Sequence, residues 1–545
     1  MTQSKKSMNN KQVAAKFDLL AKLMELHDEN PFKIRSYANA YLSLRKLEGN
    51  LAEMPKDELS AIPGVGNAIA DKIEELLSTG EMKTLNKYLV MTPVGIQEML
   101  SIKGLGPKKV KQIWKEMEIN TIGELLYACN ENRLVAFKGF GIKLQEEIKH
   151  KIEYFMDSRG KFLYAYVHHA AEELVTHLKQ KFPDHLISLC GDVRRMMPEV
   201  CGIEIITDLD KAILNLNELN ITQDEEQIFY KEIPVFLYYT KTTDFYKDLF
   251  KRSCSPDFLT YFDANNIYAG DEKAIFKSKG IRFIPSECRE TGDTIGNLSE
   301  KMTNLISIEE IKGIIHNHTT YSDGLHSLAD MASYVYQSGY EYLVISDHSK
   351  SAGYAGGLSE ERVFMQWNEI ERLNSEYNKS FRIFKGIESD ILSDGSLDYS
   401  NEILSKFDLV IASVHSGLQM DEERATSRLI KAIENPYTRI LGHPTGRLLL
   451  AREGYPLDFR KVIDACASNN VVIELNANPQ RLDLDWTWIP YCMEKGVQIA
   501  INPDAHSKES IHYIRYGVAA ARKGSLTSGM CLNTKSLQEF ITWLS

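Results

Sequence analysis

The chain contains 545 residues, of which 43% are hydrophobic and 26% are charged, and its formal net charge is −11. This composition is typical of folded globular domains and excludes a disordered or low-complexity chain, while the length predicts several domains. No apolar run approaches the roughly 20 residues of a membrane-spanning helix. The polar N-terminal sequence MTQSKKSMNNKQ has no apolar signal region, so we expect a cytoplasmic protein without membrane contact.

Neither the cysteines nor the net charge identifies a partner. The eight cysteines are scattered without a C-x-x-C pair, which predicts reduced thiols rather than disulfides or a thiolate metal site. Residues 1–150 carry 22 Lys and Arg against 19 Asp and Glu, a net charge of +3, so the remainder carries −14. Because the charge is unevenly spread, only motifs can decide whether the protein binds nucleic acid.

The N-terminal region shows the spacing of amphipathic helices. Apolar side chains recur three or four residues apart between residues 11 and 60, as in Val13, Phe17, Leu20, Met24, Ile34, Tyr37, Tyr41 and Leu44. The sequence therefore predicts an all-helical region here.

A glycine motif then occurs three times, as IPGVG (62–66), IKGLG (102–106) and FKGFG (137–141), each followed by a helical pattern. This is the helix-hairpin-helix pattern, in which glycine lets the backbone approach closely and N–H groups at the helix start bind one DNA phosphate. One copy could be a plain helix connection, but three copies predict binding to the DNA backbone without sequence preference. The residues expected to bind phosphate are Gly64, Gly66, Gly104, Gly106, Gly139, Gly141, Lys108 and Lys109.

The first copy also contains a candidate catalytic lysine. The run PGVGNAIADKIEELLSTG resembles the lyase domain of family X DNA polymerases such as DNA polymerase beta. In that family the lysine matching Lys72 forms a Schiff base with the sugar of a baseless site, which requires a neutral amine. The alternative, that Lys72 is only a phosphate-contacting or solvated lysine, stays open.

Residues 159–300 continue the family X resemblance into a palm-like and thumb-like segment. GDVRR, from Gly191 to Arg195, matches the Gly-Ser-x-Arg-Arg that holds the nucleotide triphosphate in that family, but Asp192 replaces the serine and would repel phosphate. The family also needs three carboxylates for two magnesium ions, and the matching positions here are Gly202, Glu204 and Phe236.

We therefore predict a degenerate polymerase site, with templated synthesis weak or lost and magnesium binding in the palm doubtful. Asp208 and Asp210 lie nearby, but four residues further along the chain is the wrong place on that strand. We prefer the interpretation that these two carboxylates belong to a polar strand-to-helix turn.

Histidines and carboxylates follow six apolar, strand-like runs in the C-terminal part of the chain. Residues i and i+2 of a strand point to the same side, so the two imidazoles of HNH should leave one face together. Polar side chains at the carboxyl ends of successive strands are how a β/α barrel builds a metal site. The candidate ligands and catalytic residues are His316, His318, Asp323, His348, Glu388, His415, His443, Asp504 and His506.

This constellation resembles the polymerase-and-histidinol-phosphatase (PHP) family of metal-dependent phosphoesterases, from about Lys312 to the C-terminus. The matching segments are HNHTTYSDG, ISDHS, GIESDILSDGSLDY, SVHSG, GHPTGR, NANPQRLDLDW and NPDAHS. The resemblance implies a distorted seven-stranded (β/α) barrel in which these nine positions bind three divalent metal ions. Six histidines beside three carboxylates favour manganese, zinc or iron. Ile314 departs from the family, which usually has an acidic residue there, and we expect a lost outer contact to a ligand.

Together the resemblances cover essentially the whole chain and imply a bacterial family X polymerase with a C-terminal PHP barrel. The expected fold is multidomain α/β: an all-α helix-hairpin-helix region, an α/β nucleotidyltransferase-like palm and thumb, and a distorted (β/α)7 barrel. The expected boundaries are a lyase-like domain at 1–90, a fingers-like domain at 91–158, the degenerate palm and thumb at 159–300, a linker at 301–311 and the barrel at 312–545.

The expected function is a DNA-repair phosphoesterase that processes 3′ ends as a 3′-5′ exonuclease, with cleavage at baseless sites as a further option. Its partner would be gapped, nicked or 3′-ended DNA, bound by a monomer. Arg447 and Arg481 are candidate phosphate clamps, although either could pair with Asp483 or Asp485 instead. The alternatives are an active gap-filling polymerase with a PHP exonuclease, a small-molecule phosphatase and a non-enzymatic DNA-binding scaffold.

Overall fold

A computed structural model describes residues 8–47, 49–102, 104–157, 160–211, 221–224, 227–262, 271–292, 304–377 and 380–545. The chain forms two compact units, one of Met1–Leu126 with Glu146–Ile152 and the other of Tyr127–Gln145 with Glu153–Ser545. No helix of the described residues is both long enough and apolar enough to cross a membrane.

The first unit is helical, as the apolar spacing predicts. Val13, Phe17, Leu20 and Met24 form the buried face of the first helix. Two further helices, α8 (Ile122–Asn130) and α9 (Ile142–Asp157), cross the boundary between the units. The helices that lie wholly in the first unit are α1 (Asn10–Leu26), α2 (Pro31–Lys46), α3 (Lys56–Ala61), α4 (Asn67–Thr79), α5 (Lys83–Met91), α6 (Val94–Met99) and α7 (Pro107–Lys115).

The three glycine motifs share one backbone conformation. The first glycine of each pair has a positive φ: 82° at Gly64, 99° at Gly104 and 94° at Gly139. Residues other than glycine rarely adopt this backbone conformation. The second glycine directly precedes a helix, and Gly66 and Gly106 are the N-caps of α4 and α7. The glycines are exposed while the apolar residue between each pair is buried, and the N–H of that apolar residue donates to the carbonyl three residues earlier, which closes the turn.

The second unit contains a mixed five-stranded sheet with strand order β2-β4-β7-β6-β5. Its strands are β2 (Ile187–Leu189), β4 (Ile203–Thr207), β5 (Ile221–Asp224), β6 (Gln227–Tyr230) and β7 (Ile233–Tyr239). The helix α10 (Tyr164–Lys181) packs on β2 and β4, and the one-turn helix α11 (Gly191–Arg194) follows β2. Further along the chain lie α12 (Phe245–Arg252), α13 (Pro256–Tyr261) and α14 (Glu272–Ser278).

The C-terminal part of the second unit is a nearly closed, seven-stranded parallel barrel with strand order β14-β13-β12-β11-β10-β9-β8. Beyond the strand ends, a parallel bridge between Asn317 and Ala505 links the first strand to the last. The strands are β8 (Gly313–Ile314), β9 (Tyr342–Ile345), β10 (Arg382–Asp390), β11 (Leu409–Ser413), β12 (Thr438–Leu441), β13 (Val472–Asn476) and β14 (Ile499–Asn502). The predicted fold class, including the PHP-type barrel, is confirmed.

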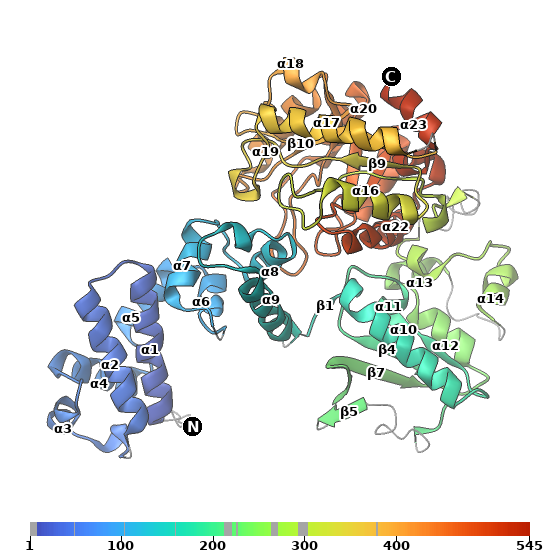
Figure 1. The fold of residues 1–545 in the computed structure, drawn as a ribbon. Coiled ribbons are helices and arrows are strands. Elements are labelled where there is room, and N and C mark those ends of the chain that lie inside the picture. Colours follow the sequence, from blue (N-terminus) through green and yellow to red (C-terminus); the bar gives the residue numbers. More distant parts are fainter. Residues whose placement is uncertain are drawn as a thin grey trace. The chain divides into compact units, whose positions relative to one another are not determined.

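Helices cover the outside of this barrel (Figure 1). They include α16 (Leu328–Gln337), α17 (Glu360–Glu376), α19 (Glu422–Ile433), α20 (Phe459–Asn469) and α22 (Ile514–Lys523). Residues 304–311, expected to be a linker, contact the barrel instead: Ile306 and Ile311 belong to its core, and the backbone N–H of Ile306 donates to Leu526.

Alternate residues of each strand belong to two apolar clusters. Leu343 and Ile345 belong to the larger cluster with the helices, whereas Tyr342 and Val344 join a second cluster formed mainly by residues of the barrel strands. Burial on both faces explains why the strands read as continuous apolar runs rather than alternating ones. The last helix, α23 (Leu537–Leu544), contributes Phe540, whose ring stacks on Tyr342 at 4.3 Å.

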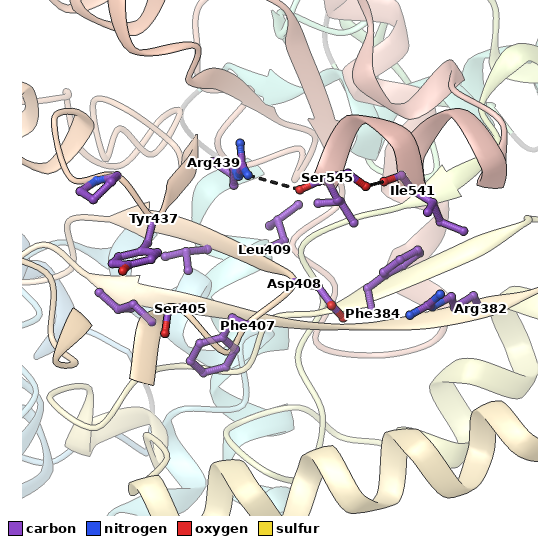
Figure 2. Close-up of a pocket in the computed structure, with 14 residues that line it drawn as sticks. Arg382, Phe384, Ser405, Phe407, Asp408, Leu409, Tyr437, Arg439, Ile541 and Ser545 are labelled. Carbon is purple, nitrogen blue, oxygen red and sulfur yellow. Dashed lines mark hydrogen bonds between the residues drawn. The ribbon is translucent and has the colours of Figure 1, made fainter. Parts of the chain in front are cut away.

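A hollow of about 470 Å³ lies at the N-terminal ends of the barrel strands (Figure 2). Its walls include Arg382 at the start of β10, Leu409 at the start of β11 and Ser545 after α23. None of its lining residues is among the nine predicted ligands. Those ligands follow the opposite ends of the strands, so the polar site and this hollow lie at different ends of the barrel.

Candidate metal centre

The nine predicted ligands lie at the carboxyl ends of the barrel strands. Glu388 is inside β10, His348 and His415 follow β9 and β11 within three residues, and His443 follows β12. Asp504 and His506 follow the end of β14 by two and four residues. Because the carboxyl ends of parallel strands meet at one end of a barrel, segments that are far apart in sequence converge here.

His316 and His318 lie on the same side, but not because they alternate along a strand. The strand β8 ends at Ile314, and His316 adopts a left-handed backbone with a φ of 65°. The backbone of His318 is fixed instead by a hydrogen bond from its N–H to the carbonyl of Ala505 at 2.9 Å. The two imidazole centroids are 5.3 Å apart.

The side chains form overlapping clusters in which single ligand atoms lie within 4.8 Å of one another. The ninth predicted residue, His443, adjoins them, since its Nε2 lies 2.9 Å from Oε1 of Glu388. The clusters within the predicted set are His318, Asp323, His348 and His506; His316, His318 and Asp504; and His348, Glu388 and His415.

Several polar atoms of these residues are buried and form no hydrogen bond with any described residue. They are His316 Nε2, His318 Nδ1, Asp323 Oδ2, His348 Nδ1 and Nε2, Glu388 Oε2, His443 Nδ1 and His506 Nε2. Burying a polar atom without a partner is costly, and neutral imidazoles and carboxylates are the ligands of Zn²⁺, Mn²⁺ and iron. These residues therefore fit divalent metal ions.

The charge balance of the cluster is reflected in its pKa values. Burial opposes the charged form of every group, yet His348 and His506 hold the pKa of Asp323 well below its ordinary value. Against the same burial, Asp323 and Glu388 raise the pKa of His348 to about 10. Burial and the neighbouring His506 and His348 instead lower the pKa of His318 to about 3. The carboxylates are thus ionised and ready to serve as ligands.

Carboxylates that the sequence analysis missed lie against the far nitrogen of two of the histidines. Glu474, in the middle of β13, lies 2.6 Å from Nδ1 of His316, and Asp390, at the end of β10, lies 2.5 Å from Nδ1 of His415. Such a carboxylate fixes the tautomer and orientation of a metal-binding imidazole. The signal that could have identified Glu474 is a charged residue inside the apolar run VVIEL. Ile314, where an acidic residue was expected, is buried in the barrel core, and Glu474 is the carboxylate on His316.

A further missed residue, Asp347, holds the first histidine loop in place. Its carboxylate accepts hydrogen bonds from the N–H and hydroxyl of Thr319, both at 2.8 Å, and from the side-chain amide of Gln366 at 2.6 Å. These contacts fix the backbone directly after His318, so the ligand loop is held by buried hydrogen bonds rather than by strand pairing alone.

The two predicted phosphate clamps are already engaged. Arg447 pairs with Asp485 at 2.6 Å and also donates to the carbonyl of Arg481 at 2.9 Å. Arg481 lies 3.9 Å from Asp504 but donates to the hydroxyl of Tyr127 at 2.7 Å. A cation that the sequence analysis missed is Arg133, whose guanidinium lies 3.8 Å from Asp323 and whose Nε forms no hydrogen bond with any described residue.

In the palm, a side chain of the protein itself contacts the loop that was predicted to bind a triphosphate. The backbone N–H of Asp192 donates to the carboxylate of Glu204 at 2.7 Å, so this carboxylate sits on the start of α11. Glu204 pairs in register with Phe236 across β4 and β7, which leaves a ring where a neighbouring carboxylate would be needed. Gly202 has a φ of 152°, and a Cβ there would collide with the backbone of Pro234.

The two arginines of this loop also form ion pairs within the protein. Arg194 pairs with Glu272, and Arg195 pairs with both Asp192 and Glu290, the latter at 2.7 Å. Asp208 instead accepts from the N–H of Leu186 and the hydroxyl of Thr242, each at 2.8 Å. Asp208 thus links the segments next to β2 and β7, which agrees with its interpretation as part of a polar turn.

The residues predicted to contact DNA lie on exposed parts of the helical region. Lys108 is exposed and Lys109 half-buried in the first turn of α7, and Lys72 is half-buried on α4. Lys103, within the second motif, lies outside the described residues.

Comparisons with known proteins place these observations in a family. A helix-hairpin-helix domain matches residues 8–82, and a SAM-like helix-hairpin-helix tandem matches residues 96–152. The DNA polymerase/3′-5′ exonuclease PolX of Bacillus subtilis (strain 168) is 30% identical over 570 residues, which cover 98% of this chain and 99% of that protein. The chain belongs to the PolX family.

Further relatives of this PolX protein match its C-terminal part alone. A probable phosphatase of Thermoanaerobacter sp. (strain X514) is 29% identical over 230 residues, covering 40% of this chain and 89% of the relative. A probable phosphatase of Caldanaerobacter subterraneus is 30% identical over 203 residues, covering 35% of this chain and 74% of the relative. The predicted resemblance to a bacterial family X polymerase with a PHP barrel is confirmed.

We expect His316→Ala and His348→Ala each to abolish hydrolysis of a small chromogenic phosphodiester, with a loss of about a hundredfold or more. Each change removes a candidate ligand from the buried cluster, so the metal content of the purified protein should fall as well. DNA binding should stay nearly intact because the hairpin motifs lie elsewhere in the chain. Full activity and full metal content in both variants would refute the metal-site assignment, and His177→Ala, on the exposed side of α10, serves as the control.

Proposed function

We propose that this PolX-family chain is a metal-dependent phosphoesterase that hydrolyses phosphodiesters or phosphomonoesters at DNA 3′ ends, and that its polymerase site is inactive or nearly so. The observation that carries the first half is the cluster of six histidines and three carboxylates, seven of which have a buried side-chain atom that forms no hydrogen bond with any described residue. The name of the Bacillus subtilis relative, DNA polymerase/3′-5′ exonuclease PolX, agrees with an activity at DNA 3′ ends.

The proposed centre would hold three divalent ions, with manganese, zinc or iron favoured by the many imidazoles. Such ions supply positive charge to phosphate oxygens and make water more acidic. The chain supplies the rest: Glu474 and Asp390 orient His316 and His415, and the burial of the cluster keeps its charges strong. Arg133 lies next to Asp323, and its Nε forms no hydrogen bond with any residue that the structure describes. It is therefore better placed to contact a substrate phosphate than Arg447, which forms an ion pair with Asp485.

The hairpin motifs would bind the DNA. Exposed glycine turns present N–H groups ahead of a helix start, and Lys108 adds charge directly after the second turn. Such contacts hold the phosphate backbone without reading sequence, which suits an enzyme for gapped, nicked or 3′-ended DNA. This feature favours DNA over a small phosphorylated metabolite, although the phosphatase relatives share the barrel.

The inactive polymerase site follows from the contacts in the palm. The start of α11, where a triphosphate would bind, already carries the carboxylate of Glu204. The arginines that would bind phosphate are neutralised by Glu272 and Glu290. With Gly202 and Phe236 at the remaining positions, two magnesium ions have no pair of carboxylates to bridge, and transfer of a nucleotide needs both.

A direct assay tests the hydrolytic function. DNA labelled at its 3′ end, as a gapped duplex and as a duplex with a baseless site, is incubated with the chain and Mn²⁺, in parallel with phosphorylated metabolites. We expect release of label from the 3′ end and no comparable turnover of the metabolites. Turnover of metabolites without release of label would favour the small-molecule phosphatase.

We expect Gly104→Val, and separately Lys108→Glu combined with Lys109→Glu, to weaken DNA binding without changing hydrolysis of a small chromogenic phosphodiester. Gly104 has a φ of 99°, so valine strains the turn, and each lost phosphate contact lowers the salt slope of binding by about one. Fluorescence anisotropy at several salt concentrations measures both effects. Lys406→Glu, at the end of the barrel remote from the histidines, is the control, and unchanged affinity and slope would move the DNA surface elsewhere.

We expect Lys72→Ala to remove any adduct with baseless-site DNA that borohydride can trap, because only a neutral amine forms the imine. Lys83→Ala, on the exposed side of α5, should leave trapping unchanged. Trapping that survives in Lys72→Ala would assign the chemistry to another lysine. Absence of trapping in the unmodified chain would mean that Lys72 only contacts phosphate or solvent.

We expect no template-directed extension of a gapped primer above background, with either magnesium or manganese at physiological nucleotide concentrations. The physical reason is that Glu204 alone cannot organise two ions while it also accepts a hydrogen bond from the backbone of Asp192. Primer extension on a sequencing gel gives the measurement. Robust extension that disappears in Glu204→Ala would overturn the prediction and would mean that Asp208 or Asp210 had replaced the missing ligands.

A further inference from the structure

We infer that Glu131, which lies outside the barrel in the segment Tyr127–Gln145, is a positioning residue for the metal centre because it orients His506. This inference rests on the proposed metal-dependent function. Its consequence is that the hydrolytic centre is complete only when this segment, which also contains the third hairpin motif, is docked on the barrel.

Glu131 and His506 are in direct contact. Oε2 of Glu131 forms an ion pair with Nδ1 of His506, and this oxygen forms no hydrogen bond with any described residue. Oε1 accepts a hydrogen bond from the side-chain amide of Asn478 at 3.2 Å. Glu131 is only 2% exposed and His506 only 3%. A carboxylate buried this deeply needs a proton donor, and Nδ1 of His506 is the donor that its free oxygen faces.

The other ring nitrogen of His506 faces the metal cluster. Its Nε2 lies 3.3 Å from Oδ1 of Asp323 and belongs to the atoms that form no hydrogen bond with any described residue. The imidazole thus stands between the carboxylate of Glu131 and the cluster. Besides Glu131, Nδ1 has the backbone oxygen of Asp504 at 3.1 Å and the carboxylate oxygen Oδ1 of Asp504 at 3.8 Å.

The same arrangement occurs twice more within the barrel. Nδ1 of His316 faces Glu474 while its Nε2 lies 3.3 Å from Oε1 of Glu388, and Nδ1 of His415 faces Asp390 while its Nε2 lies 3.1 Å from that same oxygen. Each of the three histidines therefore has a carboxylate behind it and the cluster in front. The pair with Glu131 differs in one respect, because its carboxylate comes from the region that precedes the palm in the chain.

Several contacts fix the segment that carries Glu131. The hydroxyl of Tyr127 accepts hydrogen bonds from the guanidinium of Arg481 at 2.7 and 3.0 Å, and the amide of Asn130 donates to Gln480 at 2.6 Å. Arg133 lies over the ring of Tyr354 at 4.9 Å. These partners lie in the loops at the carboxyl ends of the barrel strands, so the segment is docked beside the cluster and any shift of the segment moves Glu131 away from His506.

The chain links this positioning to the DNA-binding elements. The third hairpin motif, residues 137–141, follows Glu131 in the same segment and in the same compact unit. The amide of Gln145, at the start of α9, donates to Asn132 at 3.0 Å, which ties the helix after the motif to the residue next to Glu131. A phosphate held by this motif would therefore stabilise the docked segment and, through Glu131, the orientation of His506.

Metal binding to the full-length chain tests the inference without any DNA or substrate. Titration with Mn²⁺ followed by electron paramagnetic resonance, and with Co²⁺ followed by visible absorption, reports affinity and ligand geometry separately. In Glu131→Gln we expect one of the bound ions to dissociate about ten- to a hundredfold more readily, with an altered Co²⁺ spectrum. Glu131→Asp, which keeps the charge, should recover part of the affinity.

Two further variants calibrate the measurement. Glu474→Gln removes the matching carboxylate behind His316 and should cause a loss of the same order, whereas Glu147→Gln, an identical change on the exposed side of α9, should cause none. Melting temperatures verify that each variant is folded, and if Glu131→Gln fails to fold, Glu131→Asp carries the test through its affinity and spectrum.

The outcomes separate this inference from the proposed function. If the unmodified chain binds no ion, the proposed metal-dependent function fails. If the unmodified chain binds metal and Glu131→Gln matches Glu147→Gln in affinity and spectrum, only the role of Glu131 fails. Faster hydrolysis of a chromogenic phosphodiester by Glu131→Gln would likewise overturn the inference, because it would mean that Glu131 blocks the centre rather than orienting a ligand.

Discussion

The constraint on which this structure depends is the burial of six imidazoles and three carboxylates at one end of a barrel whose interior is otherwise apolar. Charged and polar groups are removed from water at a high cost, and the protein compensates by surrounding each histidine with acceptors and each carboxylate with donors. Even so, one nitrogen or oxygen on most of these residues still forms no hydrogen bond with any described residue. Divalent cations would supply the missing partners, because histidine nitrogens and carboxylate oxygens are the atoms that bind them.

The barrel meets this constraint by keeping the polar cluster at one end and apolar side chains in its interior. Aromatic and aliphatic side chains fill the interior, and Phe540 of the last helix stacks on Tyr342 there. At the other end, Asp347 gathers hydrogen bonds from the loop after His318, while Glu474 and Asp390 each face one ligand histidine. The ligands are thus held by buried partners with fixed geometry, and rigid partners of this kind make a metal site selective.

The palm shows the same physics in the loop that resembles a triphosphate site. Internal carboxylates contact the arginines and a backbone N–H group of this loop. Glu204 accepts from the start of α11, and Glu290 pairs with Arg195. Lys523, from the barrel helix α22, is itself buried and donates to Glu290 at 2.7 Å, so this loop is part of the packing between palm and barrel.

The sequence alone was sufficient for the fold class, and it singled out nine side chains that the structure places at one end of the barrel. Glycine turns predict their own backbone conformation, and residues at the carboxyl ends of parallel strands converge whatever the lengths of the loops between them. His316 reached its position through a left-handed turn rather than through the strand alternation that the sequence predicts. This error did not matter because the convergence depends on topology, not on the last residue of a strand.

Only the tertiary structure decided which carboxylates contact the far nitrogen of the cluster histidines and which arginine lies beside the cluster. Glu131 precedes His506 by hundreds of residues and carries no motif, so its contact with the centre could not be predicted from spacing. Arg447 was expected to bind a phosphate, but it forms an ion pair with Asp485. Arg133 lies beside the cluster instead. The physical reason is the same in each case: a ligand at a strand end is specified by local chain geometry, whereas its partner is specified by how separate segments pack.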